Sequence, residues 1–219
     1  MHLAVEICGE QLLLSPERSI VWPRRGALIV ADAHFGKDDV FRRAGIALPR
    51  GPTVDDLQRL TRLLEAYQLQ RLIVLGDFLH AATRDGDAFL HAFAIWRRSH
   101  AQLTIDVVAG NHDRREARDK WVDAVRWHSR LLTDGPFVLT HEPREHADGY
   151  VLAGHIHPTV RLPDGRRSMR VPVFWQLPHA LVLPAFGSFT GGANITRVPG
   201  DRIYAIGPQG VIELFPYPF

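Results

Sequence analysis

Residues 27–34 read Ala-Leu-Ile-Val-Ala-Asp-Ala-His, an apolar run that ends in a carboxylate and an imidazole. Short apolar runs rich in β-branched residues are typical of buried strands. Side chains two residues apart on an extended segment point to the same side, so Asp32 and His34 can face one centre. This stretch therefore predicts a buried strand over residues 27–31 with a polar site at its end.

Four further runs have the same organisation. Strands are expected over residues 71–75, 104–109, 136–140 and 150–153. The polar motifs at their ends are Gly76-Asp77-Phe-Leu-His80, Gly110-Asn111-His112-Asp113, Thr140-His141 and Gly154-His155-Ile-His157. Ligand sites in open α/β sheets gather beyond the strand ends. We therefore expect all five motifs to meet in one site.

The composition fits a single globular domain over residues 1–219. Hydrophobic residues make up 46% of the chain, which supports a sizeable core, and the net charge is only +2. The single cysteine, Cys8, excludes a disulfide within the chain. The N-terminus lacks the basic region of a signal peptide, and no apolar run approaches the roughly 20 residues that span a bilayer. A cytoplasmic protein without membrane association is expected.

Helical spacing accompanies the strands in the first half of the chain. A helix is predicted over residues 53–68, opened by a capping-box-like pair of Thr53 and Asp56, and a second over residues 87–99. A third is predicted after Asp113, where Trp121 and His128 fall at helical spacing. From residue 160 onward, short extended runs broken by Pro and Gly predict hairpins. Two sheets with helices outside are expected.

The motifs supply seven candidate metal ligands and no thiolate. They are Asp32, His34, Asp77, Asn111, His141, His155 and His157. Imidazole, carboxylate and amide ligands favour manganese, iron, zinc, cobalt or nickel. Seven groups fit two ions roughly 3.5–4 Å apart better than one, and Asp77 is the expected bridge. Two divalent ions would leave the site positive enough to attract a phosphate ester. Glycines before Asp77, Asn111 and His155 permit close backbone approach.

The order of the five motifs resembles the calcineurin-like metallophosphoesterase superfamily. The resemblance implies a four-layer αββα sandwich. It assigns one ion to Asp32, His34, Asp77 and His157, and the other to Asp77, Asn111, His141 and His155. A metal-bridging hydroxide would attack phosphorus. His112 would be the catalytic histidine that assists the leaving oxygen, and Asp113 would be its orienting partner.

A narrower resemblance extends the match. Residues Asp32-Ala-His-Phe-Gly-Lys37, Thr140-His-Glu-Pro143 and Pro184-Ala-Phe-Gly-Ser-Phe-Thr-Gly-Gly192 resemble the DNA-ligase-associated (PdeM-type) metallophosphoesterases. This group implies a manganese-dependent phosphodiesterase that acts as a DNA endonuclease in repair, beside a helicase and an ATP-dependent DNA ligase. DNA of single-stranded character is the expected substrate. His80 stands where many superfamily members have Asp or Asn, and it also occurs in repair nucleases. It is expected to contact the scissile phosphate or its flanking nucleotide.

Three basic residues follow the first motif, and other functions fit the same chemistry. Lys37, Arg42 and Arg43 could bind a phosphate backbone, or could lie on a solvated loop. A phosphodiesterase or phosphatase for a small nucleotide or a phosphoprotein is the alternative function. A non-catalytic scaffold with a decayed site is the third, but decay should delete ligands and none of the seven is missing.

Overall fold

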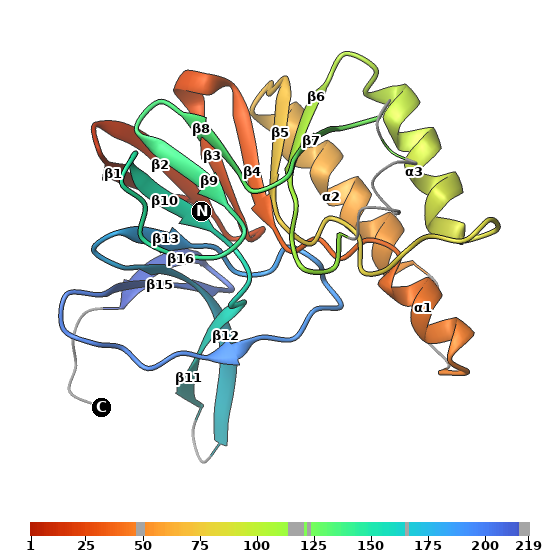
Figure 1. Ribbon diagram of the computed structural model, residues 1–219. Coiled ribbons are helices and arrows are strands. Elements are labelled where there is room, and N and C mark those ends of the chain that lie inside the picture. Colours follow the sequence, from red (N-terminus) through yellow and green to blue (C-terminus); the bar gives the residue numbers. More distant parts are fainter. Residues whose placement is uncertain (47–50, 114–120, 122–123, 165–166, 215–219) are drawn as a thin grey trace.

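The computed structural model (Figure 1) describes residues 1–46, 51–113, 121, 124–164 and 167–214. Its helices are the 3₁₀ turn η1 (Pro23–Arg25), α1 (Lys37–Arg43), α2 (Pro52–Ala66) and α3 (Ala88–Ser99). Its strands are β1 (Leu3–Ile7), β2 (Glu10–Ser15), β3 (Ser19–Trp22), β4 (Ala27–Ala31), β5 (Arg71–Leu75), β6 (Thr104–Val108), β7 (Arg126–His128), β8 (Leu131–Asp134), β9 (Phe137–Thr140), β10 (Tyr150–Ala153), β11 (Pro158–Asp164), β12 (Arg167–Gln176), β13 (Ala180–Val182), β14 (Ala193–Asn194), β15 (Arg202–Gly207) and β16 (Gly210–Leu214). No helix within these ranges is long and apolar enough to cross a membrane.

The first sheet runs in the order β1 to β7. Strands β1 to β4 pair antiparallel, whereas β4 to β7 pair parallel. In the parallel part, Ala31 lies beside Leu75, and Leu75 lies beside Val108. These three strands therefore end level with one another, and the segments that follow them begin at the same edge of the sheet.

Both faces of this sheet are buried, because side chains alternate along each strand. In β4, Leu28 and Val30 pack under α2 and α3, in a cluster that includes Leu60 and Phe93. Ala27, Ile29 and Ala31 face the other way, into a cluster shared with the second sheet. Helices α2 and α3 cover one face of the first sheet, and the second sheet covers the opposite face (Figure 1).

The second sheet has the order β14-β11-β12-β13-β10-β9-β8, with β15 and β16 joined through β12. Strands β9, β10 and β13 are parallel, so the segments after β9 and β10 leave the sheet at one edge. The hairpin of β11 and β12 projects from the body of the molecule (Figure 1). The resulting arrangement is a mixed α/β fold with two packed sheets.

The layers differ from the expected four-layer αββα sandwich. Helices α2 and α3 cover the first sheet, while part of the outer face of the second sheet is covered by the extended segment around Ile195. Within the described ranges no helix lies on that outer face, so the fourth layer stays a prediction.

Two helix predictions need correction. His128 belongs to β7, where backbone hydrogen bonds to β6 hold residues 126–128 extended; the predicted third helix otherwise falls largely on residues 114–120, 122 and 123, which lie outside the described residues. The capping-box pair does not form, because α2 begins at Pro52 with Gly51 as its N-cap. Thr53 instead donates to Asp38 (Oγ1–Oδ1 2.7 Å), and Asp56 accepts from the backbone N–H of Ser188 (3.0 Å).

Candidate metal centre

The predicted ligands converge from both sheets. Asp32 and His34 follow β4, Asp77 follows β5 and Asn111 follows β6, whereas His141 follows β9 and both His155 and His157 follow β10. Among the described residues, three groups have ligand atoms close enough to hold an ion: Asp32–His34–His157, Asp32–Asp77–His141 and His34–His80–His112. The first two consist of predicted ligands alone. The level strand ends of the two sheets therefore bring residues more than 100 positions apart into one site.

The backbone at this site adopts an unusual conformation. Among the described non-glycine residues eight have positive φ, and five of these are site residues: Asp32, His34, Asp77, His155 and His157, with φ between 46° and 71°. The left-handed region is disfavoured for residues with a Cβ, although Asp and His visit it more readily than most. Backbone strain of this kind persists where surrounding structure enforces it, often at functional sites. Here it turns the strand ends so that the ligands face one another.

The glycines in the motifs are required by close packing. A Cβ at Gly76 would overlap the imidazole of His141, one at Gly110 would overlap the carboxylate of Asp77, and one at Gly154 would overlap the carboxylate of Asp32. Each glycine thus makes room for a ligand that belongs to another motif. The glycines therefore allow the close backbone approach that the sequence predicts.

The separations between ligand atoms suit divalent ions. Asp32 Oδ1 lies 3.4 Å from His157 Nε2, and Asp77 Oδ2 lies 3.8 Å from His34 Nε2 and 3.7 Å from His141 Nε2. Two ligands that are each about 2.1 Å from one ion lie roughly 3.0–3.5 Å apart. Asp32 Oδ1 and His157 Nε2 are also buried without a hydrogen-bond partner among the described residues. A shared cation would satisfy both atoms, so the residues fit a metal centre.

Two of the predicted ligands stand beside these groups. The imidazole of His155 contacts that of His141 (Nδ1–Nε2 3.0 Å), and the backbone N–H of His155 donates to Asp32 Oδ2 (2.8 Å). Asn111 is exposed and lines a hollow together with His141. The resemblance assigns both residues, together with His141, to the second ion.

The surroundings of His34 and His80 favour the neutral form of both imidazoles. Burial, followed by the charges of His157 and Lys37, lowers the pKa of His34 to about 2. Burial, followed by the charge of Lys37, lowers the pKa of His80 to about 4. Neutral imidazoles have a lone pair available for a metal or a proton. His34 can therefore act as a ligand at pH 7 without first losing a proton.

His112 is held by the backbone of another motif. Its Nδ1 lies 2.8 Å from the carbonyl oxygen of His80, and because a carbonyl only accepts, Nδ1 carries the proton. The rings of His80 and His112 stack with their centroids 5.1 Å apart, and His34 lies edge-on to both. His112 also donates its backbone N–H to Asp77 Oδ1 (2.8 Å).

Asp113 is predicted to orient the imidazole of His112, but its carboxylate has other partners. Its carboxylate accepts backbone N–H groups from Phe78 (3.1 Å), Leu79 (2.8 Å) and Gly110 (3.0 Å). Burial nevertheless raises the pKa of Asp113 to about 6. Asp113 therefore ties two motif loops together, while the carbonyl group of His80 orients His112. No sequence pattern identifies a backbone carbonyl in such a role.

The three basic residues after the first motif have different surroundings. Arg42 pairs with Asp38 (3.0 Å) and Asp39 (2.6 Å), and Arg43 pairs with Asp87. Lys37 is half-buried at the start of α1, and its positive charge contributes to lowering the pKa of both His34 and His80. A contact of Lys37 with a phosphate stays a prediction. The i, i+3 and i, i+4 spacing of Asp39 and Asp38 before Arg42 is the sequence signal for its ion pairs.

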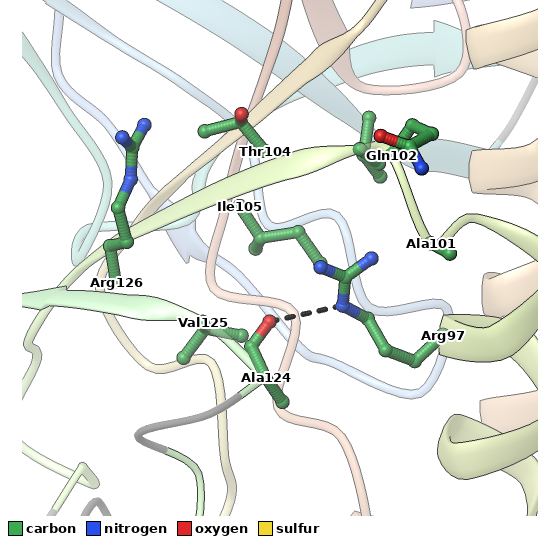
Figure 2. A pocket seen from close by; sticks show the side chains of 9 residues that line it. Arg97, Ala101, Gln102, Thr104, Ile105, Ala124, Val125 and Arg126 are labelled. Atoms are coloured by element: carbon green, nitrogen blue, oxygen red, sulfur yellow. Dashed lines mark hydrogen bonds between the residues drawn. The ribbon is translucent and has the colours of Figure 1, made fainter.

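A second hollow lies at the other end of the first sheet. It is formed where α3 ends and β6 begins, beside Arg97, Thr104 and Arg126 (Figure 2). Arg97 is held there by the carbonyl oxygen of Ala124 (3.2 Å). None of the motif residues lines this hollow, and it is separate from the candidate site.

The chain is similar to a nuclease of known structure. It shares 38% identity with nuclease MPE of Pseudomonas putida, and the match covers 98% of this chain and 100% of that one. The two structures superpose with a TM-score of 0.84. The chain belongs to this metallophosphoesterase family. No protein-family model and no curated protein matches the chain.

Two other structures resemble this metallophosphoesterase more remotely. One is a protein from Aquifex aeolicus (15% identity, TM-score 0.44, covering 60% of this chain and 78% of that one). The other is the phosphoesterase Yfce from E. coli (14% identity, TM-score 0.42, covering 83% and 88%). Both are too distant to support residue assignments. The family itself places the chain among hydrolases that act on phosphodiester bonds.

Proposed function

We propose that this chain is a two-metal phosphodiesterase, manganese-dependent, that cuts DNA internally during repair. The observation that carries the proposal is the convergence of two carboxylates and four imidazoles, with Asn111 beside them, at the level strand ends of two sheets. Divalent ions bound there would supply Lewis-acid polarisation of a phosphoryl oxygen and a nucleophile at neutral pH. The 38% identity to a nuclease over the whole chain supports a nucleic acid as the substrate.

The residues divide into those that hold ions and those that act on the substrate. Asp32, His34, Asp77 and His157 would hold one ion, and Asp77, Asn111, His141 and His155 the other. Since Nδ1 of His112 is occupied by the carbonyl group of His80, Nε2 is the atom that can give a proton to the leaving oxygen. His80, stacked on His112, and Lys37 would contact the phosphate or its flanking nucleotide.

Replacing His112 tests the catalytic step. His112→Ala should lower turnover of an aryl phosphodiester by roughly 10²–10⁴-fold, the usual scale for general acid catalysis, while both ions stay bound. Steady-state kinetics and metal content by mass spectrometry measure the two effects. Unchanged turnover would remove His112 from the mechanism, and loss of metal would make it a structural residue instead.

Circular single-stranded DNA tests the substrate. The manganese-loaded protein should linearise the circle, which has no end for an exonuclease, and Asn111→Ala protein should not. Hydrolysis of an aryl phosphodiester with an intact circle would favour a small nucleotide as the substrate. Preference for a phosphomonoester would favour a phosphatase, and less than one bound ion per chain would favour a scaffold. Association with a repair helicase and an ATP-dependent DNA ligase, and a cytoplasmic location, are further parts of the proposal.

A further inference from the structure

A small basic cavity opens behind one metal ligand. The imidazole of His157 donates from Nδ1 to the carbonyl oxygen of Gly191 (3.2 Å), and on that side of the ring lies a cavity of about 180 Å³. Arg18, in the turn between β2 and β3, and Arg170, on β12, line it, and none of the described residues around it is acidic. The cavity therefore combines two guanidinium groups with a position next to a predicted metal ligand.

The cavity contains polar groups with unused hydrogen-bonding capacity. Thr190 lines it, and its buried Oγ1 has no hydrogen-bond partner among the described residues. Arg170 donates from Nη1 to the carbonyl oxygen of Gly192 (3.1 Å), which holds its side chain at the rim and leaves other N–H groups free. Arg18 lies near Asp56, but that carboxylate is already paired with Arg59 (3.3 Å). An anion with several acceptor oxygens would satisfy these donors.

The projecting hairpin adds positive charge beside the cavity. In the register of β11 and β12, Arg161 lies directly opposite Arg170, so two like charges share one face of the hairpin. Directly opposed like charges destabilise a pair of strands. Both residues are exposed, and neither pairs with a carboxylate among the side chains that the structure describes. Such a pair is favourable once a polyanion lies across it.

The two sides of the metal centre differ in charge and in aromatic exposure. The hollow beside Asn111 is lined by Glu142 and Glu145 as well as by arginines, and Glu142 pairs with Arg144 (2.7 Å). On the cavity side, Phe189 is 40% exposed, one residue before Thr190. Basic grooves flanked by aromatic side chains are typical of proteins that bind single-stranded nucleic acid.

We propose that the DNA strand next to the cut phosphate follows the hairpin side, with a flanking phosphate in the cavity between Arg18, Arg170 and Thr190 and the next one near Arg161. This inference rests on the proposed function and specifies the path of the DNA strand over the protein: the strand leaves the metal centre past His157 and not past Asn111. Arg18 and Arg170 are positioning residues in this scheme, since they contact phosphates that do not react.

The test compares arginines on the two sides of the centre. Manganese-loaded wild type, Arg170→Ala, Arg18→Gln and the control Arg144→Ala are assayed on a single-stranded oligonucleotide and on bis(4-nitrophenyl) phosphate at several salt concentrations. Each cavity variant should lower the ratio of kcat/KM on the oligonucleotide to that on the aryl diester by about tenfold, mainly through KM. Each should also make log kcat/KM less steep in log salt by about 0.7, the value of one phosphate contact on a single strand.

The outcomes separate the inference from the proposed function. If both cavity variants keep the wild-type ratio of kcat/KM values and the wild-type salt dependence, the inference is overturned, while a DNA-cutting enzyme stays in place. An equally large fall of that ratio in Arg144→Ala would also overturn it. A wild type that hydrolyses the aryl diester and leaves the oligonucleotide intact would overturn the DNA substrate itself. If circular dichroism shows that Arg170→Ala is misfolded, the salt dependence of kcat/KM is measured instead for Arg161→Ala, on the exposed face of the hairpin.

Discussion

At the scale of single residues, the candidate site depends on the missing Cβ atoms of three glycines as well as on the side chains of its predicted ligands. Gly76 has φ of 78°, and its missing Cβ leaves space for the imidazole of His141. Gly110 and Gly154 do the same for Asp77 and Asp32. Three of the five motifs therefore carry a predicted ligand of their own and a space for a predicted ligand of another motif, which explains why glycine and predicted ligand are adjacent in those three motifs.

Gly76→Ala tests this arrangement. The new Cβ should displace His141, lower metal affinity by roughly 10–100-fold and reduce the bound ions from two toward one. The matched control is Gly9→Ala, since Gly9 has nearly the same φ (75°) but open space where its Cβ would stand. Metal titration by calorimetry distinguishes the two variants. Equal losses in both would mean that backbone strain, and not the overlap with His141, is responsible.

At the scale of elements, charged side chains connect the parallel strands β5, β6 and β7 around Asp106, in the middle of β6. Asp106 on β6 is buried, and it accepts from Arg71 on β5 (2.8 Å) and from Arg126 (2.9 Å) and His128 (2.9 Å) on β7. Desolvation works against the charged form, but the hydrogen bonds from His128, Arg71 and Arg126 outweigh it and hold the pKa of Asp106 below its usual value. This network connects β7 to the sheet.

The pH dependence of stability follows from the sign of that shift. A carboxyl group whose pKa is lower in the folded state stabilises the protein above its unfolded pKa, near 3.9, and loses this effect as the pH falls through the folded value. Asp106→Asn should therefore lower the free energy of unfolding by about 3 kcal/mol at pH 7 and pH 5, with a smaller difference below pH 4.

Urea unfolding of the metal-free protein measures the effect of Asp106→Asn. The control is Asp148→Asn, because the side chain of Asp148 is 71% exposed and should contribute less than about 1 kcal/mol. A loss in Asp106→Asn that stayed constant down to pH 2 would contradict the explanation by charge.

At the scale of the whole molecule, the candidate metal centre is built from segments of both sheets. Asp32 and Asp77 come from the ends of strands in the first sheet, and His141 and His157 follow strands of the second. Ions that bind all four would act as cross-links between the layers, in addition to the apolar contact of Ile29 and Ala31 with the second sheet. Metal binding should therefore stabilise the whole fold and not a single loop.

Thermal unfolding measures this linkage. Manganese at about 100 times its Kd should contribute about 2.7 kcal/mol per ion, which corresponds to a rise in Tm of roughly 5–10 °C for one ion in a chain of this size. A chelator should reverse the rise, and His141→Ala should reduce it. A Tm that did not respond to manganese, in a protein shown to bind the metal, would mean that unfolded chains bind it equally well.

The sequence by itself determined the elements with strong local signals. The apolar runs predicted β4, β5 and β10 with their observed bounds, and helical spacing predicted α2 and α3 to within two residues. The two-residue spacing of Asp32 and His34, and of His155 and His157, predicted ligands that share one centre. The predictions of these strands and helices succeeded because periodicity is a local property of the chain, whereas the ligand role of the Asp and His residues stays a prediction.

Only the tertiary structure decided which groups meet across the sequence. The pairing of His112 with the carbonyl group of His80, the ion pair of Arg43 with Asp87, and the cavity between Arg18 and Arg170 all depend on how distant segments are brought together. These pairings join segments up to about 150 residues apart, and no local pattern encodes them. A strand pattern specifies which face of a strand is buried, whereas contacts beyond the strand ends are fixed only when both sheets have formed.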